Sequence, residues 1–271
     1  DEKMIIVKAG GNGSLDIDAV CRDVAALVEE GEQVVLVHGG SHETTRISEL
    51  LGHPPRFVTS PSGHTSRYTD RETLEIFAMV VAGRVNKLLV ERLQQLGVNA
   101  LGLCGLDGRL LEGKRKSALR IKENGKLKVL RGEYSGIIEN VNADLLTTLL
   151  NAGYVPVVAP VAVSYESEAL NVDGDRAAAA IGTALKADRV VILSNVPGLL
   201  RDVSDETSLV SHVPSDQARD YLDRYAKGRM KRKVLGAVEA LRDGVEQVII
   251  ADGRVDQPLR RALAGQGTVL R

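Results

Sequence analysis

Aromatic residues are scarce in this sequence, and tryptophan is absent. Phe, Tyr and Trp together account for 3% of the 271 residues. Proteins that bind single-stranded nucleic acid stack its bases on aromatic side chains, so this composition argues against such a partner. The formal net charge of -1 at pH 7 also lacks the basic excess of polyanion-binding domains. We therefore expect small molecules or proteins as ligands, and no nucleic acid.

Cysteines and long apolar runs are scarce as well. The two cysteines, Cys21 and Cys104, are too few for a disulfide framework. No apolar run approaches the roughly 18 residues that cross a bilayer. The DEK start lacks the basic and then apolar profile of a signal peptide. We expect a reducing, cytoplasmic setting and no membrane association.

Short β-branched runs alternate with segments of helical periodicity along most of the chain. Such alternation predicts an α/β fold with a mainly parallel sheet covered by helices. Cys21 lies on the apolar stripe of the first predicted helix, so it is expected in the core. The predicted strands are 4–7, 34–37, 100–103, 155–158, 190–193 and 248–251, and the predicted helices are 17–28, 42–51, 71–96, 142–151, 175–186 and 230–243.

One basic segment breaks this alternation. Residues 109–135 are polar and alternating, with a turn expected at 123–126, which predicts a β-hairpin that projects from the sheet. Between 109 and 131 it holds nine Lys or Arg against two Glu, a net charge of +7. Such a surface suits an acidic partner, although from the residues alone a solvated hairpin whose lysines only oppose aggregation is the favoured interpretation. The stretch 53–63 is expected to be a surface loop.

Two glycine loops follow the first two predicted strands. Lys8 to Gly13 reads KAGGNG and residues 38–41 read HGGS. Backbone N–H groups in such loops bind phosphate, and open α/β sheets bind ligands at these strand ends. A tight turn would also use glycine. The Rossmann and Walker fingerprints are not met, and His38 is expected to be a packed strand-end residue.

Charged residues begin two later helices. Asp173 and Asp175 precede an alanine-rich helix, where Asp175 would orient a lysine, bind Mg²⁺ through water, or cap the helix. Position 176 is not Gly and position 182 is not Glu, which excludes an EF-hand. Lys231, Arg232 and Lys233 begin the other helix, and composition does not choose among them as a phosphate ligand.

Taken together, these motifs resemble the amino-acid kinase family, and most closely its acetylglutamate kinase branch. Within that branch the chain is similar to kinases that act on aminoadipate attached to an amino-group carrier protein. Acetylglutamate kinases usually have GGG and NxNAD where this chain has GGS and NVDGD. The motifs, in order, are KAGG, VHGGS, GHPPRF, SRYTDRETLEIF, VNK, GLDGRLLEGKRK, RGEYSG, LNVDGD, LSNVPG and GRMKRKVLGAVEA.

The resemblance implies roles for individual residues. Lys8 and Lys233 match the two catalytic lysines that neutralise the transferring phosphoryl group, and Asp175 matches the aspartate that holds them. The implied substrate-binding residues are Gly39, Gly40, Ser41, Arg67 and Asn171. The implied ATP-binding residues are Gly10, Gly11, Ser194, Asn195, Gly198 and Lys233, and the implied carrier-binding residues on the hairpin are Lys114, Arg115, Lys116 and Arg120.

It also implies a three-layer αβα sandwich around an open sheet, with ATP and Mg²⁺ as cofactors and no protein metal cage. Residues 1–165 would form the lobe for the acyl substrate, carrier and dimer partner, and 166–271 the ATP lobe. A homodimer would use the apolar residues of 71–96, which monomer core would also explain. The implied partner is an acidic carrier of the LysW type. Alternatives are carrier-linked glutamate, free N-acetylglutamate, or a non-catalytic amino-acid sensor.

Overall fold

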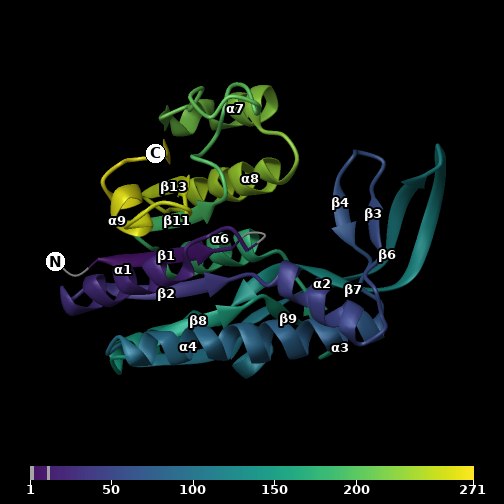
Figure 1. Cartoon of the computed structure of the whole chain (residues 1–271), viewed down its shortest axis with the longest axis horizontal. Helices are drawn as coiled ribbons and strands as arrows, with labels where there is room; N and C mark the ends of the chain where they lie inside the picture. Colours follow the sequence, from purple (N-terminus) through teal and green to yellow (C-terminus); the bar gives the residue numbers. More distant parts are fainter. Residues whose placement is uncertain (1–2, 11–12) are drawn as a thin grey trace.

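An eight-stranded sheet forms the centre of the molecule (Figure 1). The computed structural model describes residues 3–10 and 13–271. The strand order is β12-β14-β13-β11-β1-β2-β8-β5, and the neighbours are parallel except for the antiparallel pair β13 and β14. The strands are β1 Met4–Ala9, β2 Gln33–His38, β5 Ala100–Cys104, β8 Val155–Ala159, β11 Arg189–Ser194, β12 His212–Val213, β13 Gln247–Asp252 and β14 Thr268–Leu270.

Helices cover both faces of this sheet. In β1, Ile6 packs with one set of helices, while Ile5 and Val7 face the other set. Strands buried on both faces read as continuous apolar runs, which is why the sequence revealed them. The first set is α5 Ala143–Asn151, α6 Gly174–Leu185, α7 Ala218–Tyr225 and α8 Arg229–Arg242, and the second is α1 Ile17–Glu29, α4 Asn86–Gln95 and α9 Pro258–Leu263.

This arrangement confirms the predicted three-layer αβα sandwich. The sheet runs through both predicted lobes, with β1 directly beside β11. Cys21 is fully buried in the core, as expected. Within the described residues, no helix is long and apolar enough to span a membrane.

The predicted helix 71–96 consists of three consecutive pieces. α3 Arg71–Ala78 leads into a π-helical segment, Met79–Val85, and then into α4. The apolar positions that favoured a dimer interface are at most 7% exposed within one chain. They therefore form monomer core, and the argument for a dimer from these residues does not hold. These positions are Leu74, Ile76, Phe77, Val80 and Val81.

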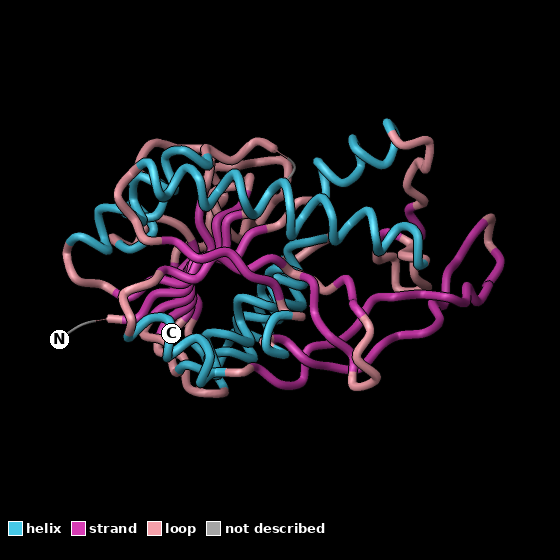
Figure 2. Tube along the Cα trace, turned by 90° about the horizontal axis from the view of Figure 1, so that it is seen from below, coloured by secondary structure: helices cyan, strands magenta, loops and turns pink. Residues whose placement is uncertain are grey.

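The predicted basic hairpin is present and projects from the body (Figure 2). It consists of β6 Leu111–Glu123 and β7 Lys126–Val141, joined by Asn124 and Gly125, both of which have positive φ as a tight hairpin turn requires. Its base joins β9 Val161–Ser164 and β10 Ala169–Asn171 in a closed ring of four strands.

A second, smaller hairpin lies beside the first. β3 Phe57–Thr59 pairs with β4 Thr65–Arg67, so the expectation of a plain surface loop over 53–63 was wrong in part. The chain then continues to α3, and α2 Ser41–Leu50 precedes this hairpin. Three-residue strands with polar ends carry too little periodicity to be recognised in the sequence.

Two helical glycines provide a test of the packing, Gly182 of α6 against the sheet and Gly236 of α8 against α6. A Cβ at Gly182 of α6 would lie 2.4 Å from Val190 Cγ2, whereas one at Gly236 of α8 would have ordinary contacts at 3.6 Å. Gly182→Ala should therefore lower the free energy of unfolding by about 1–3 kcal/mol through overpacking. Gly236→Ala should be neutral or stabilising by up to about 1 kcal/mol. Urea unfolding of both variants checks this, and shifts of equal sign and size would contradict it.

Candidate active site

The carboxyl ends of β1, β2 and β11 bring the two glycine loops together. Ala9 pairs with both His38 and Leu193, so Gly10, Gly39 and Ser194 follow at the same edge of the sheet. A Cβ placed on Gly39 would lie 3.8 Å from Gly10 Cα, so the loops approach each other through their backbones. Gly11 lies outside the described residues.

Two lysines from distant parts of the chain bind one carboxylate beside these loops. Lys8 Nζ lies 3.0 Å from Asp175 Oδ1, and Lys233 Nζ lies 2.6 Å from Asp175 Oδ2. Lys8 and Asp175 are each 6% exposed. Burial acts to raise the pKa of Asp175, but the charges and hydrogen bonds of the two lysines outweigh it and hold that pKa well below its ordinary value. The cluster therefore carries two cations and one anion.

Glycine makes room for the first lysine. A Cβ on Gly10 would lie 2.1 Å from Lys8 Nζ, and one on Gly174 would lie 2.7 Å from Lys8 Cε. Any larger residue at either position would displace the ammonium group. The GG and DGD motifs therefore shape the cluster as well as offering backbone N–H groups.

Asp173, and not Asp175, caps helix α6. The Asp173 side chain accepts a hydrogen bond from Arg176 N at 3.1 Å. The capping interpretation of Asp175 is therefore wrong, since Asp175 lies in the first turn and binds the lysines. Burial and the charge of Asp175 raise the pKa of Asp173, while Lys8 and Arg232 act in the opposite direction.

The structure shows which of the three basic residues at the start of α8 points into the candidate active site. Lys233 reaches Asp175, Arg232 lies 3.9 Å from Asp173, and Lys231 is exposed. Helical periodicity could have predicted that Lys233 faces the core, because it lies one turn before Gly236 and Ala237, which are buried. That face of α8 packs against α6.

Arg67 lies on the other side of the glycine loops. It is 7% exposed, and its Nη2 donates to Ser41 O, Ser41 Oγ and Thr45 Oγ1, each at 3.0 Å. Its Nη1 is buried and has no hydrogen-bond partner among the described residues. Within residues 3–10 and 13–271, Arg67 forms no salt bridge with a carboxylate. A buried guanidinium with a free nitrogen is suited to a carboxylate ligand.

Asn171 reaches this region through Thr69, a residue that the sequence analysis did not single out. Asn171 Nδ2 donates to Thr69 Oγ1 at 3.1 Å, and Thr69 Oγ1 donates to the Arg67 carbonyl at 3.2 Å. Thr69 N donates in turn to Glu133 Oε2 at 3.0 Å. Glu133 is 1% exposed, and burial raises its pKa to about 7, with the Thr69 N–H acting in the opposite direction. Thr69 lies in the motif RYTD and Glu133 lies in the motif RGEYSG. Both motifs carried the family resemblance, but the contact between these two residues was not predicted.

His38 is a packed strand-end residue, as predicted. Asn86 Nδ2 donates to Val157 O and lies 3.0 Å from His38 Nε2, which must therefore accept. His38 Nδ1 then carries the proton and donates to Gly39 O at 2.7 Å. Burial lowers the pKa of His38 to about 4, so the ring is neutral at pH 7. His38 thus orients the second glycine loop without acting as an acid or base.

The residues expected on the nucleotide side lie along β11 and its loop. Ser194 is 3% exposed and its carbonyl accepts from Gly253 N at 2.7 Å. Asn195 is half-buried. A Cβ at Gly198 would lie 2.6 Å from Thr268 Oγ1, so this glycine allows the loop to pack against β14. Ser194 lies beside Gly10, while Gly198 has a packing role.

The hairpin residues expected to bind a carrier differ in their surroundings. Lys114, Lys116 and Arg120 are exposed. Arg115 is bound within the fold: its Nε donates to Glu133 O at 2.8 Å, and its guanidinium lies 3.8 Å from the Tyr134 ring centroid. Replacing Arg115 would therefore disturb packing as well as charge.

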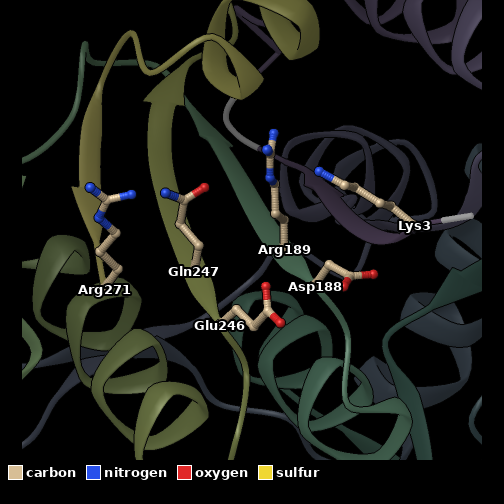
Figure 3. Close-up of a pocket in the computed structure, with 6 residues that line it drawn as sticks. All are labelled: Lys3, Asp188, Arg189, Glu246, Gln247 and Arg271. Atoms are coloured by element: carbon tan, nitrogen blue, oxygen red, sulfur yellow. The ribbon is translucent and has the colours of Figure 1, made fainter. Parts of the chain in front are cut away.

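A surface hollow of about 190 Å³ lies elsewhere, where β1, β11 and β13 begin (Figure 3). It is lined by Lys3, Asp188, Arg189, Glu246, Gln247 and Arg271. The first and last residues of parallel strands lie at opposite edges of a sheet. The hollow is therefore separated from the edge with Lys8 and Asp175 by the length of the strands. It is no part of the candidate active site.

Two lysine cations beside two glycine loops, at the ligand-binding edge of an open α/β sheet, are suited to stabilising a phosphoryl group during its transfer. The class of protein that this fold and site define is a phosphotransferase. The chain belongs to the amino acid kinase family, whose model matches residues 3–252. This confirms the resemblance found in the motifs.

Curated relatives match almost the whole chain. It is 58% identical over 267 residues to the [LysW]-aminoadipate kinase of Deinococcus radiodurans, covering 98% of this chain and 91% of that protein. It is 57% identical over 270 residues to the [LysW]-aminoadipate kinase of Thermus thermophilus, covering 99% and 100%. A putative [LysW]-aminoadipate/[LysW]-glutamate kinase of Cenarchaeum symbiosum is 48% identical and covers 96% of both chains.

Solved structures share the fold at low identity. N-acetylglutamate synthase from Neisseria gonorrhoeae superposes with a TM-score of 0.79 at 24% identity, covering 99% of this chain and 59% of that chain. Carbamate kinase from Giardia lamblia bound to AMP-PNP gives 0.70 at 14% identity, covering 99% and 98%. These likenesses support the fold alone.

Asp175→Asn tests the cluster. It removes the anion that holds Lys8 and Lys233, so kcat should fall by about 10²-fold or more. The pKa of Asp175 is lower in the folded protein than in the unfolded chain, where it is about 4. Its ionisation therefore stabilises the fold at pH values above about 4. This stabilisation is lost as the pH falls through the lower pKa of the folded protein. The variant should therefore also be less stable at pH 7 than the parent.

Asp144→Asn is the matched control, because Asp144 occupies the same first-turn position of α5 but is exposed. It should keep both rate and stability. Steady-state kinetics and urea unfolding of the two variants make the comparison. A normal kcat in Asp175→Asn would remove the cluster from catalysis.

Proposed function

We propose that this protein transfers the γ-phosphoryl group of ATP to the side-chain carboxylate of aminoadipate attached to an acidic LysW-type carrier protein, in lysine biosynthesis. The observation that carries the proposal is the binding of Lys8 and Lys233 by the single carboxylate of Asp175 at the glycine loops. The names of the relatives at 57% and 58% identity supply the substrate.

The reaction needs positioning and charge more than a protein nucleophile. A substrate carboxylate is already ionised at pH 7, so it attacks the γ-phosphorus without a general base. The new oxygen–phosphorus bond forms as the bond to the β-phosphate oxygen breaks, and ADP leaves with the negative charge. Lys8 would stabilise the transferring group and Lys233 the charge on the nucleotide side, while Asp175 keeps both ammonium groups in place.

The two ends of the acyl group would be held by different residues. Arg67, with its unpartnered Nη1, is suited to a carboxylate, and Ser41 already contacts the same guanidinium. Asn171, fixed by Thr69, would bind the amide that links aminoadipate to the carrier. Gly39 and Gly40 would allow close approach to the substrate.

ATP would lie over β11, with Gly10 and Gly11 at its phosphates and Ser194, Asn195 and Gly198 in the loop beside it. Mg²⁺ bound together with ATP would neutralise part of the phosphate charge. Among the described residues no cluster of three or more His, Cys, Asp or Glu is arranged to hold a metal. The division into an acyl lobe, 1–165, and an ATP lobe, 166–271, stays a prediction, as do the homodimer and the cytoplasmic location.

Carrier-linked glutamate is the second candidate substrate. It is favoured by the relative from Cenarchaeum symbiosum, whose name includes both substrates. The two acyl groups differ by one methylene, which a pocket distinguishes by only about 1–3 kcal/mol. Free N-acetylglutamate has no observation in its favour, and a non-catalytic sensor disagrees with the intact cluster of Lys8, Asp175 and Lys233.

The proposed function is tested by comparing carrier-linked aminoadipate with free N-acetylated aminoadipate and N-acetylglutamate as phosphate acceptors. We expect kcat/KM to be highest for the carrier-linked form and to fall as salt screens the basic hairpin. ADP release at several salt concentrations measures both. Equal use of the free compounds, unaffected by salt, would leave a small-molecule kinase, and no turnover of any acceptor would favour the sensor.

Arg67→Ala should raise KM for the acyl substrate about 10- to 100-fold, the effect of losing a hydrogen bond to a charged group. KM for ATP should stay within a few-fold of the parent value. Arg46→Ala on α2 is the control, because Arg46 is exposed and pairs with Glu43. Similar increases in KM for both ligands would assign Arg67 a structural role.

A further inference from the structure

The outer half of the long hairpin has two unlike faces. From Ala118 paired with Arg131 to Glu123 paired with Lys126, the register is unbroken, so paired residues share a face. One face carries Ile121, which is 1% exposed, and Glu123, which binds Arg56 at 3.3 Å. The small hairpin therefore covers this face, as its position beside β6 in Figure 1 also indicates.

The opposite face is uncovered and apolar at its centre. Leu127 is 73% exposed and Val129 is 55% exposed, and as residues two apart on one strand they lie side by side. Their partners across the hairpin are Lys122 and Arg120, which are also exposed. Two adjacent large apolar side chains bordered by cations have the composition of an interface with an acidic protein.

The distance from the candidate active site limits what this face can bind. Lys122 lies six residues beyond Lys116 on β6, roughly 20 Å at about 3.3 Å per residue. Lys116 lies near the candidate active site, because its partner Ser135 on β7 also pairs with Asn171 of β10. A ligand that occupies the active site and also touches the outer half of the hairpin must therefore be a macromolecule.

A second copy of this chain is a poor occupant of this face. A twofold contact centred on this small face would bring the cations Arg120 and Lys122 of the two copies close together. Like charges directly opposed are destabilising. An acidic partner meets no such repulsion.

We propose that Arg120, Lys122, Leu127 and Val129 form a docking face for the folded body of the acidic carrier protein, whose acyl group enters the candidate active site. This proposal rests on the proposed function and adds an apolar contact to the charge attraction already expected of the hairpin. The cations attract the carrier at long range, and burial of Leu127 and Val129 slows its release.

The double change Leu127→Ser and Val129→Ser tests the docking face. Both side chains are exposed, so the variant should fold and melt like the parent. KM for carrier-linked aminoadipate should rise about 10- to 100-fold, as for loss of interface anchors, with kcat and KM for ATP unchanged. Aminoadipate on a short peptide copied from the carrier's attachment site should be used equally by variant and parent.

Val203→Ser is the matched control, because Val203 is a 62% exposed apolar residue on a loop of the C-terminal half. It should leave every constant unchanged. If the parent uses the carrier-linked substrate and the double variant does so with KM within twofold of the parent, the docking face is overturned while the proposed function stands. If the parent does not use that substrate, both fall. Loss of self-association in the variant, measured by sedimentation, would assign the face to a second copy instead.

Discussion

The carboxylate of Asp175 is the constraint on which the active site depends. The ammonium groups of buried Lys8 and half-buried Lys233 would repel each other at this separation, and a single anion between them makes their proximity possible. The three residues come from β1, α6 and α8, so the cluster also joins the sheet to two helices of one covering layer. Gly10 and Gly174 leave the space that Lys8 fills. Charge and fold are therefore coupled: the site forms only when the sandwich has closed.

Much of the sandwich could be predicted because its sheet is buried on both faces. Apolar runs such as 34–37 and 190–193 are informative for that reason, and the helices between them show clear periodicity. Lys8 was identifiable from its place after the first strand. Lys233 was not separable from Lys231 and Arg232 by composition, because the choice depends on how α8 rotates against α6.

Contacts between polar segments that lie far apart along the chain could not be predicted from the sequence. Thr69 and Glu133 lie 64 residues apart, and neither residue's own neighbours indicate that the amide of one binds the carboxylate of the other. The small hairpin at 57–67 owes its position to β6, which lies far along the chain. The dimer argument from 71–96 failed for a related reason, because periodicity identifies an apolar face without showing what covers it.

The burial of both cysteines has a practical consequence. Burial raises the thiol pKa of Cys21 to about 11 and raises that of Cys104, so neither is a ready nucleophile at neutral pH. Both are buried. A single cysteine introduced in place of the exposed Lys126, next to the turn at Asn124 and Gly125, would be the reactive thiol of the molecule. A fluorophore or spin label could then be attached to the hairpin tip in the otherwise native chain, and the approach of a partner followed directly.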